Sequence, residues 1–409
     1  MFQGNLNRTG ATETIPITGN TPIWTYNFSS GDYDFISDSP VIANGCVYIG
    51  ELVLGNISVG KSYDKGVLHC LNATTGISIW NYTTESEIMW SVPVIANEML
   101  YFGDFNGTIY CLNANSGIKL WNFTTGDKVF SSPAVWNGMV YVGSDDNNTY
   151  CLNATTGKLL WKYVTSGPIV RSSPVITNGM VYIGSSDNNT YCLNATTGAL
   201  IWNYTTGGPI TFGPVVAQGM IFVTSFSIPS SQESPGHYDT KIYCFNAFNG
   251  SLIWKNTIIG GFPSSFPSVA YGRVYIGSVN SNIYCLNETT GKYMWKYQTA
   301  KEGGCSSLAI ANGMVYVGKV VGGNFYCLNA FNGALIWNYT LGQSSMSSPA
   351  IVNGMVYIAS FEGVLYCFPM IIASTNKVNG ISFGGAGEIF LFSLIGITTA
   401  ILIVKKRKK

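Results

Sequence analysis

Ten cysteines and two histidines are the residues of this 409-residue chain whose types could bind a metal or act as nucleophiles. Equivalent places in a repeated segment are occupied by eight of the cysteines: Cys70, Cys111, Cys151, Cys192, Cys244, Cys285, Cys327 and Cys367. Equivalent strands of adjacent repeats should lie more than about 7 Å apart, which is too far for a disulfide. We therefore expect small, buried apolar thiols. Cys46 and Cys305 fall outside the pattern, and Cys46 is expected on the opposite face of the sheet from Cys70.

Metal and catalytic constellations are not evident elsewhere. The chain has no CxxC and no Cys/His spacing typical of zinc or haem, so no metal site is predicted. The acidic residues Asp104, Asp145, Asp146, Asp187 and Glu362 mostly occupy short polar turns, where turn chemistry explains them. No paired carboxylates and no Ser/His/Asp grouping stand out, and His237 is interpreted as a solvated loop residue. We therefore predict no catalytic residues.

The elements that position these residues belong to a repeat of roughly 41 residues. It is clearest in Ser131–Thr165 and Ser172–Thr206. Each unit has four short runs rich in Val, Ile, Tyr and Trp, expected in the second copy at about Pro174–Thr177, Val181–Gly184, Thr190–Asn194 and Leu200–Tyr204. Each unit ends near a tryptophan: Trp24, Trp80, Trp121, Trp161, Trp202, Trp254, Trp295 and Trp337. A fixed period near 40 residues with several strands per unit predicts a β-propeller.

Turn residues separate the strands of each unit. The first two strands are joined by Asn-Gly, as at Asn137-Gly138, the preferred two-residue hairpin turn. A glycine stands four residues before the tryptophan in all seven full copies, and we expect it in a left-handed conformation. The tryptophan itself is expected to pack between neighbouring blades.

Two incomplete copies remain at the ends of the repeat. Trp24 has no Tyr-Cys strand before it, and Cys367 has no tryptophan after it. If Pro22–Phe28 supplies the fourth strand beside Ser347–Phe368, the two pieces form one blade and close the ring. The predicted fold is all-β, an eight-bladed propeller of four-stranded antiparallel blades over residues 1–368.

The C-terminal end predicts a membrane anchor. Residues 369–387 are interpreted as a short linker and residues 388–404 as one transmembrane helix, although the apolar stretch is slightly short. A buried core helix is the alternative, but a propeller needs none. The basic tail 405–409 is expected in the cytoplasm and the propeller outside the cell, as a single-pass protein of the cell membrane. No export signal is visible at Met1, so we expect the natural start to lie further upstream.

Overall charge argues against one class of partner. Charged residues make up 10% of the chain, and 5 of the 21 cations lie in the tail. Without the tail, 16 cations face 20 anions, a net charge of −4. This mildly acidic body predicts no binding to nucleic acid.

Asn-x-Ser/Thr sequons are frequent and fall mostly on two exposed places of the repeat. One place is the turn between the third and fourth strands, and the other is the residue after the tryptophan. The candidate glycosylation sites are Asn72, Asn81, Asn122, Asn153, Asn194, Asn203 and Asn338.

Units with a VYVGSxDxxxYCLN middle and a ThrGly-xxxTrp ending resemble the pyrroloquinoline-quinone-like (PQQ-like) β-propeller repeats over about Phe2–Phe368. The resemblance implies the propeller fold. For function it implies several options, because the family includes quinoprotein dehydrogenases, an outer-membrane assembly scaffold lipoprotein and many surface proteins. The membrane anchor, sequons and low charge resemble archaeal cell-surface members.

The resemblance also defines an enzyme alternative. The family's alcohol dehydrogenases use PQQ, an adjacent Cys-Cys pair, a Ca²⁺ held by Glu, Asn and Asp, and an Asp base. This chain has no adjacent cysteines. We therefore expect no cofactor, and PQQ with Ca²⁺ belongs only to the alternative of a quinoprotein dehydrogenase-like enzyme with a site on the propeller axis.

The positions that vary among otherwise similar units suggest a binding site. Three residues before the proline of the first strand, or its equivalent, stand Ser37, Trp90, Phe130, Arg171, Thr211, Ser264, Cys305 and Met346. We expect this segment near the central funnel, on the face that carries the hairpins between strands two and three. Two of these hairpins are enlarged, at Glu51–Gly66 and Thr224–Lys241.

Trp90, Phe130, Arg171 and Met346 are therefore the candidate partner-binding residues. The alternatives are that these side chains only fill the funnel, or that the protein is a spacer without a site. The function predicted is a non-catalytic binding or scaffold module at the cell surface, monomeric, with a surface protein or glycan as partner.

Overall fold

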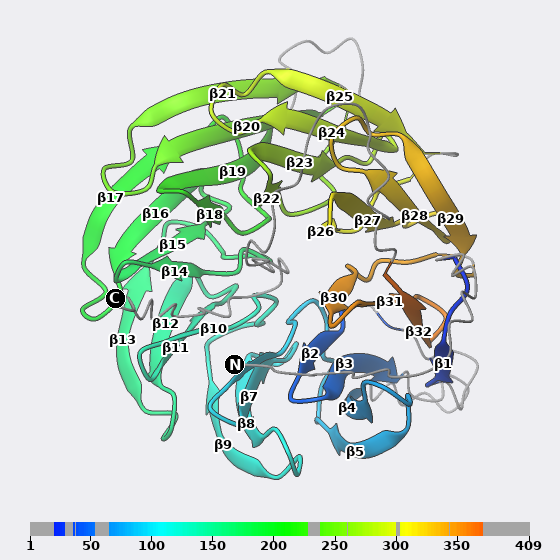
Figure 1. The fold of residues 1–409 in the computed structure, drawn as a ribbon. Coiled ribbons are helices and arrows are strands. Elements are labelled where there is room, and N and C mark those ends of the chain that lie inside the picture. Colours follow the sequence, from blue (N-terminus) through cyan, green and yellow to red (C-terminus); the bar gives the residue numbers. More distant parts are fainter. Residues whose placement is uncertain are drawn as a thin grey trace, which may run out of the picture.

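The computed structural model describes residues 20–28, 36, 38–53, 65–227, 238–259, 261–299, 303–342 and 344–370. These residues form eight four-stranded antiparallel sheets arranged as a ring (Figure 1). The predicted all-β, eight-bladed propeller is therefore confirmed. The described ranges contain no helix, and accordingly none long and apolar enough to cross a membrane. The predicted helix at 388–404 and tail at 405–409 lie outside the described residues, as does the linker from residue 371 onward.

The blades follow one another in chain order, and we number them from 1 to 8. Blade 1 contains β2 (Val41–Ala43), β3 (Cys46–Val53), β4 (Lys65–Asn72) and β5 (Ser78–Thr83). Blade 2 contains β6 (Val94–Ala96), β7 (Met99–Gly103), β8 (Thr108–Asn113) and β9 (Lys119–Thr124). Blade 3 contains β10 (Ala134–Trp136), β11 (Met139–Gly143), β12 (Asn148–Asn153) and β13 (Leu159–Val164). Blade 4 contains β14 (Val175–Thr177), β15 (Met180–Gly184), β16 (Asn189–Asn194) and β17 (Leu200–Thr205).

The second half of the ring repeats the same plan. Blade 5 contains β18 (Val215–Ala217), β19 (Met220–Ser227), β20 (Asp239–Asn246) and β21 (Leu252–Ile258). Blade 6 contains β22 (Ser268–Ala270), β23 (Arg273–Gly277), β24 (Asn282–Asn287) and β25 (Tyr293–Gln298). Blade 7 contains β26 (Ala309–Ala311), β27 (Met314–Gly318), β28 (Asn324–Asn329) and β29 (Leu335–Thr340). Blade 8 contains β30 (Ala350–Val352), β31 (Met355–Ser360), β32 (Val364–Pro369) and β1 (Trp24–Asn27).

The four strands expected in the second clear copy agree with β14 to β17 to within one residue at each end. The first strand of each blade is short and lies toward the centre, where the first strands of most neighbouring blades contact each other (Figure 1). The Asn-Gly hairpins have positive φ at both residues, as at Asn137 (49°) and Gly138 (73°). This is the backbone that a two-residue primed turn requires.

The tryptophan of one blade packs on the repeat glycine of the next blade. Gly157 has φ +69°, and a Cβ added there would lie 2.7 Å from the indole of Trp121. The glycine therefore serves twice, in the turn as predicted and as the flat surface that receives the ring. Six of the tryptophans, Trp80, Trp121, Trp161, Trp202, Trp254 and Trp295, also donate an indole N–H to a backbone carbonyl of the next blade at 2.8–3.1 Å. The predicted packing of the tryptophans between blades is confirmed.

Blade 8 is built from both ends of the described chain, as predicted. β1 pairs with β32 in a register that places Trp24 opposite Cys367. Blade 8 then joins blade 1 through a 3.0 Å hydrogen bond from the Tyr357 hydroxyl to the carbonyl of Ala73 and through the indole of Trp24 against Gly76. These contacts close the ring.

The repeat cysteines are free thiols in strand interiors, and all eight are at most 1% exposed. The predicted orientation of Cys46 is wrong. Tyr48, two residues beyond Cys46, pairs with Cys70, so Cys46 shares the face of Tyr48 and Cys70 and packs with them. A register one residue away from the expected one reverses the face of every side chain in a strand.

Candidate functional site

The segment before each first strand and the hairpin between strands two and three lie on one face of the ring, as predicted. Backbone hydrogen bonds join them: the Asp145 N–H donates to the carbonyl of Lys128, and the Phe105 N–H donates to the carbonyl of Glu87, each at 2.9 Å. The two enlarged hairpins lengthen β3 with β4 and β19 with β20. Their middles, residues 54–64 and 228–237, lie outside the described residues.

Three of the four predicted site residues come together on this face. The Arg171 guanidinium carbon lies 3.2 Å from the centroid of the Trp90 ring. Trp90 in turn packs at a tilt on Phe130, with ring centroids 5.2 Å apart. Phe105 meets Phe130 edge to face at 5.6 Å, and the ammonium of Lys128 lies 4.2 Å from the Phe105 centroid. We call these five residues the aromatic–arginine cluster; Phe105 lies in the hairpin between β7 and β8 of blade 2, and the other four lie in the segments that precede blades 2, 3 and 4.

Sequence reasoning missed Phe105 and Lys128. The signal for Phe105 was present, because the corresponding hairpin position in the two clear repeats is occupied by Asp145 and Ser186. Lys128 could be found only from the structure, because it joins the cluster through the contact of its ammonium with Phe105 in the hairpin of blade 2.

Met346, the fourth predicted residue, is 37% exposed and precedes β30 in blade 8. Within the described ranges, no ring or hydrogen-bond contact joins it to the cluster. Phe130 is only 7% exposed and Cys305 only 1%, so these two side chains fill space rather than present a free surface. Ser37 lies outside the described residues.

The backbone at two cluster residues is unusual. Trp90 has φ 60° and Arg171 has φ 55°, a left-handed region that bulky side chains rarely adopt. Of the equivalent positions that the structure describes in the other blades, none has positive φ. Each such residue costs about 1 to 2 kcal/mol. Strain of this kind persists only where the surrounding contacts determine it, and it is concentrated at functional sites.

Charged groups beside the cluster are partly removed from water. Burial lowers the pKa of Arg171 to about 10, while Asp145 acts in the opposite direction, so Arg171 remains charged at neutral pH. Burial raises the pKa of Asp145 to about 6, with repulsion from Asp127 as the next cause. Lys128 and Arg171 oppose that rise.

Asp38 is a buried carboxyl that the sequence reasoning did not single out. It is 1% exposed, and neither carboxylate oxygen has a hydrogen-bond partner among the described residues. The Trp90 backbone N–H favours its charged form without completing a hydrogen bond, and burial raises the pKa of Asp38 to about 7. Most blades have serine at this position; in blade 2, Ser91 accepts a 2.8 Å hydrogen bond from the N–H of Gly103.

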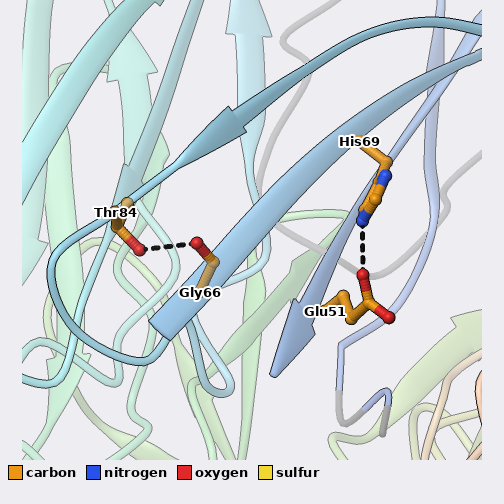
Figure 2. Close-up of polar contacts among 4 residues, drawn as sticks. All are labelled: Glu51, Gly66, His69 and Thr84. Atoms are coloured by element: carbon orange, nitrogen blue, oxygen red, sulfur yellow. Dashed lines mark hydrogen bonds and ion pairs between the residues drawn. The ribbon is translucent and has the colours of Figure 1, made fainter. Parts of the chain in front are cut away.

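Blade 1 also contains a buried histidine–carboxylate pair, shown in Figure 2. The Nε2 atom of His69 on β4 lies 2.6 Å from an oxygen of Glu51 on β3. The His69 ring meets Phe28 edge to face at 4.8 Å. Nearby, the hydroxyl of Thr84 donates a 3.0 Å hydrogen bond to the carbonyl of Gly66 (Figure 2). The pair links β3 to β4 within their lengthened hairpin.

The acidic turn residues mostly have the structural role expected of them. Asp146 accepts hydrogen bonds from the Gly126 N–H and the Tyr150 hydroxyl, and Asp187 accepts from the Ser166 N–H at 2.9 Å. These bonds connect the hairpin of one blade to the segment that precedes it. Asp145 is the exception, because one of its oxygens is buried and has no hydrogen-bond partner in the described ranges.

The residues present do not fit a PQQ and calcium site of the kind used by quinoprotein dehydrogenases. The sequence has no adjacent cysteine pair, and its repeat cysteines lie inside strands. Within the described parts of the chain, no group of three His, Cys, Asp or Glu residues could hold a metal ion. We derive no reaction step through this cofactor.

The candidate glycosylation sites fall into two structural sets. The wall sequons Asn81, Asn122, Asn203 and Asn338 follow the tryptophans and are exposed on outer strands. The turn sequons Asn72, Asn153 and Asn194 are half-buried, and each side-chain oxygen accepts two backbone N–H groups, as Asn72 does from Thr74 and Thr75 at 3.0 Å.

Fold and repeat together define this protein as an eight-bladed β-propeller of PQQ-like units. The sequence matches the family described as outer membrane protein assembly factor BamB over residues 64–209, 164–235 and 280–370. Because these matches cover more than half of the chain, it belongs to this PQQ-repeat family. Among curated proteins, none matches the sequence significantly.

Solved structures share the architecture at low sequence identity. BamB from Moraxella catarrhalis has a TM-score of 0.69 at 16% identity and covers 86% of this chain and 100% of its own. The computationally designed Ika8 protein has a TM-score of 0.67 at 14% identity and covers 83% of this chain and 98% of its own. A europium-containing methanol dehydrogenase has a TM-score of 0.65 at 12% identity and covers 86% of this chain and 93% of its own. At these identities the likeness concerns the fold alone.

Proposed function

We propose that this protein is a non-catalytic binding or scaffold propeller that recruits a partner protein through the aromatic–arginine cluster. The observation that carries the proposal is the strained pairing of Trp90 with Arg171 on the hairpin-bearing face. A propeller does not need this arrangement to close, because the other described blades reach the same fold without it. Loops on a rigid ring are the usual place for recognition.

Family membership supports the same reading. The family is described as an outer membrane protein assembly factor, and one structural neighbour has that name, so a role in contacting other proteins is reasonable for this chain. Quinoprotein dehydrogenase activity is the second candidate, motivated by the likeness to methanol dehydrogenase. The cysteine arrangement disfavours it.

The protein also needs a cellular location in which it could meet such a partner. We propose that the propeller is displayed outside the cell on a single C-terminal membrane helix at residues 388–404, followed by a cytoplasmic basic tail. N-glycans on the outer wall would be consistent with that placement. The archaeal cell-surface character suggested by low charge and frequent sequons belongs to the same proposal.

Partner recruitment can be tested with a photo-crosslinking amino acid placed at Phe105 in the full-length chain. In membranes of the source organism, we expect one discrete protein adduct that is lost in Trp90→Ala and Arg171→Ala. A probe at Ile253, exposed on outer strand β21, is the matched control and should give no such adduct. Equal labelling at both positions, or an adduct indifferent to both substitutions, would contradict the proposal.

The enzyme alternative has its own test. Native mass spectrometry and absorbance scanning would be applied to the full chain supplied with PQQ and Ca²⁺. A stoichiometric mass increase with a quinone absorbance would overturn the non-catalytic proposal. We expect neither.

A further inference from the structure

The guanidinium of Arg171 lies over the Trp90 ring and is not hydrogen-bonded within the part of the chain that the structure describes. It stacks on Trp90 at 3.2 Å, and no described residue accepts a hydrogen bond from it or forms an ion pair with it. Asp145 is the acid that acts on it, but their charged atoms are not within ion-pair distance. A guanidinium offers five N–H donors in a planar fork, and partial burial makes their lack of partners costly.

Lys128 is a second cation in the same condition. Its ammonium lies over Phe105 at 4.2 Å and farther from Phe130 at 6.0 Å. It too has no ion-pair partner among the residues that the structure describes. The cluster is therefore a row of three aromatic rings with a cation stacked at each end.

Trp90 fixes the direction in which the Arg171 fork points. One side of the indole carries the guanidinium, and Phe130 packs against the ring at a tilt. The face of the indole that carries the guanidinium is therefore closed to a sugar ring. What the cluster offers is the outer face and edge of the guanidinium. Left-handed backbone at both residues indicates that surrounding contacts enforce this arrangement.

We propose that the Arg171 guanidinium binds a carboxylate on an acidic side chain of the partner protein, with an adjoining apolar side chain packed against Phe105. The proposal rests on the proposed function and specifies the chemistry of its partner. Arginine is suited to bidentate contact with carboxylates, and a stacked guanidinium loses little freedom on binding. Asp145 acts on the Arg171 guanidinium, and it favours a singly charged carboxylate over a doubly charged phosphate, since each negative charge on the ligand is repelled.

The chain has only four arginines, Arg8, Arg171, Arg273 and Arg407, so their Nε–Hε signals can be resolved by nuclear magnetic resonance on ¹⁵N-arginine-labelled full-length protein. The probe is the blocked tetrapeptide acetyl-Gly-Glu-Phe-Gly-amide. The same peptide with glutamine is the neutral control. We expect the glutamate peptide to shift the Arg171 signal and the glutamine peptide to leave it unchanged.

Variants separate a specific site from general attraction. Arg171→Lys retains the charge but removes the planar fork, and we expect binding at least about tenfold weaker. Arg273→Lys is the matched control, because Arg273 also lies over a ring, 5.0 Å from Phe331, yet far along the chain in blade 6. We expect it to bind as the unmodified protein does. Unchanged melting temperatures in both variants would exclude unfolding as the cause.

Several outcomes would overturn the inference. These are equal shifts with the glutamate and glutamine peptides, equal weakening by both variants, or no shift at Arg171. A larger response to a phosphoserine peptide or to a chitooligosaccharide would also overturn it and would identify a different ligand. The crosslinking result distinguishes the two failures: an adduct that still depends on Trp90 would preserve the proposed function while the carboxylate inference is rejected.

Discussion

Asp38 is the one acidic residue at its position in the eight repeats. Six of its seven equivalents are the neutral residues Ser91, Ser131, Ser172, Ser265, Ser306 and Ser347, and the seventh is Phe212 in blade 5. Asp38, by contrast, is a buried carboxyl with no hydrogen-bond partner among the described residues. A buried group in this condition is expected to hold its proton. Asp38 lies beside the backbone of Trp90, a cluster residue. Ionisation of Asp38 would therefore place a buried negative charge next to the proposed site.

The raised pKa of Asp38 predicts a loss of stability as pH rises. Its ordinary pKa is 3.8 and its folded pKa is about 7, so between these values the unfolded chain releases a proton that the folded chain retains. Rising pH therefore favours unfolding across this window, by up to about 4 kcal/mol, and has no further effect above pH 7. In urea unfolding at pH 4.5 and pH 8, we expect Asp38→Ser to remove most of the difference.

Ser172→Ala is the control for this prediction, because it removes a hydrogen bond to the Gly184 N–H without removing a titrating group. It should lower stability equally at both pH values. Asp145, with its pKa raised to about 6, contributes in the same direction but is present in every variant compared. If Asp38→Ser leaves the pH dependence unchanged, the carboxyl does not retain its proton in the folded state.

Among the elements, the contribution of the contact between a tryptophan and the glycine of the next blade can be measured separately from the contribution of turn geometry. Gly157 and Gly138 both have positive φ, at +69° and +73°. A Cβ on Gly157 would meet the Trp121 indole at 2.7 Å, whereas a Cβ on Gly138 would meet nothing within 4 Å. We expect Gly138→Ala to cost about 1 kcal/mol of backbone strain and Gly157→Ala about 2 kcal/mol more from the displaced ring. Equal losses in denaturant unfolding would show that blade packing tolerates the methyl group.

The two sequon sets predict unequal glycosylation. The turn side chains are fixed by two hydrogen bonds at each oxygen, whereas the wall side chains are exposed on outer strands. In a host that glycosylates the folded chain, we expect Asn81, Asn122, Asn203 and Asn338 to be occupied more than Asn72, Asn153 and Asn194. Peptide mass mapping before and after glycan removal measures occupancy, with Thr205→Ala as the control that abolishes the Asn203 sequon. Higher occupancy in the turns would contradict the structural argument.

Strands and turns were predictable from the sequence because their causes are local. Alternating apolar residues and Asn-Gly turns place β14 to β17 within one residue, and the repeat supplies the blade count. The register of β3 against β4 is not determined by local sequence, and the predicted orientation of the Cys46 side chain was therefore wrong. Register depends on packing across the blade, which the turn residues between these strands do not specify.

The candidate site was predictable in position but not in arrangement. Variation among the repeats indicated Trp90, Phe130 and Arg171, and the structure brings these three together. Their stacking depends on a left-handed backbone at two bulky residues, which sequence patterns do not suggest. Asp38 was detectable as the one acid aligned with the serines, but its lack of a partner required the structure.

At the scale of the whole molecule, ring closure depends on one short strand. β1 has four residues, yet it completes blade 8 and places Trp24 on Gly76 of blade 1. Without β1, the edge of β32 and the surface of blade 1 that Trp24 covers would both be exposed. The first and last described segments therefore determine whether the blades form a ring or an open arc.

Removing β1 and supplying it separately tests this role. We expect a chain lacking residues 1–28 to unfold at a lower temperature and over a broader range, because blade 8 and its contact with blade 1 are both lost. A synthetic peptide of residues 20–28 should restore the melting temperature, and the same peptide with Trp24→Ala should restore much less, since the indole provides most of the contact with Gly76. Calorimetry with increasing peptide measures the effect. If the shortened chain melts like the full chain, closure contributes little, and the ring is stabilised by neighbouring blades alone.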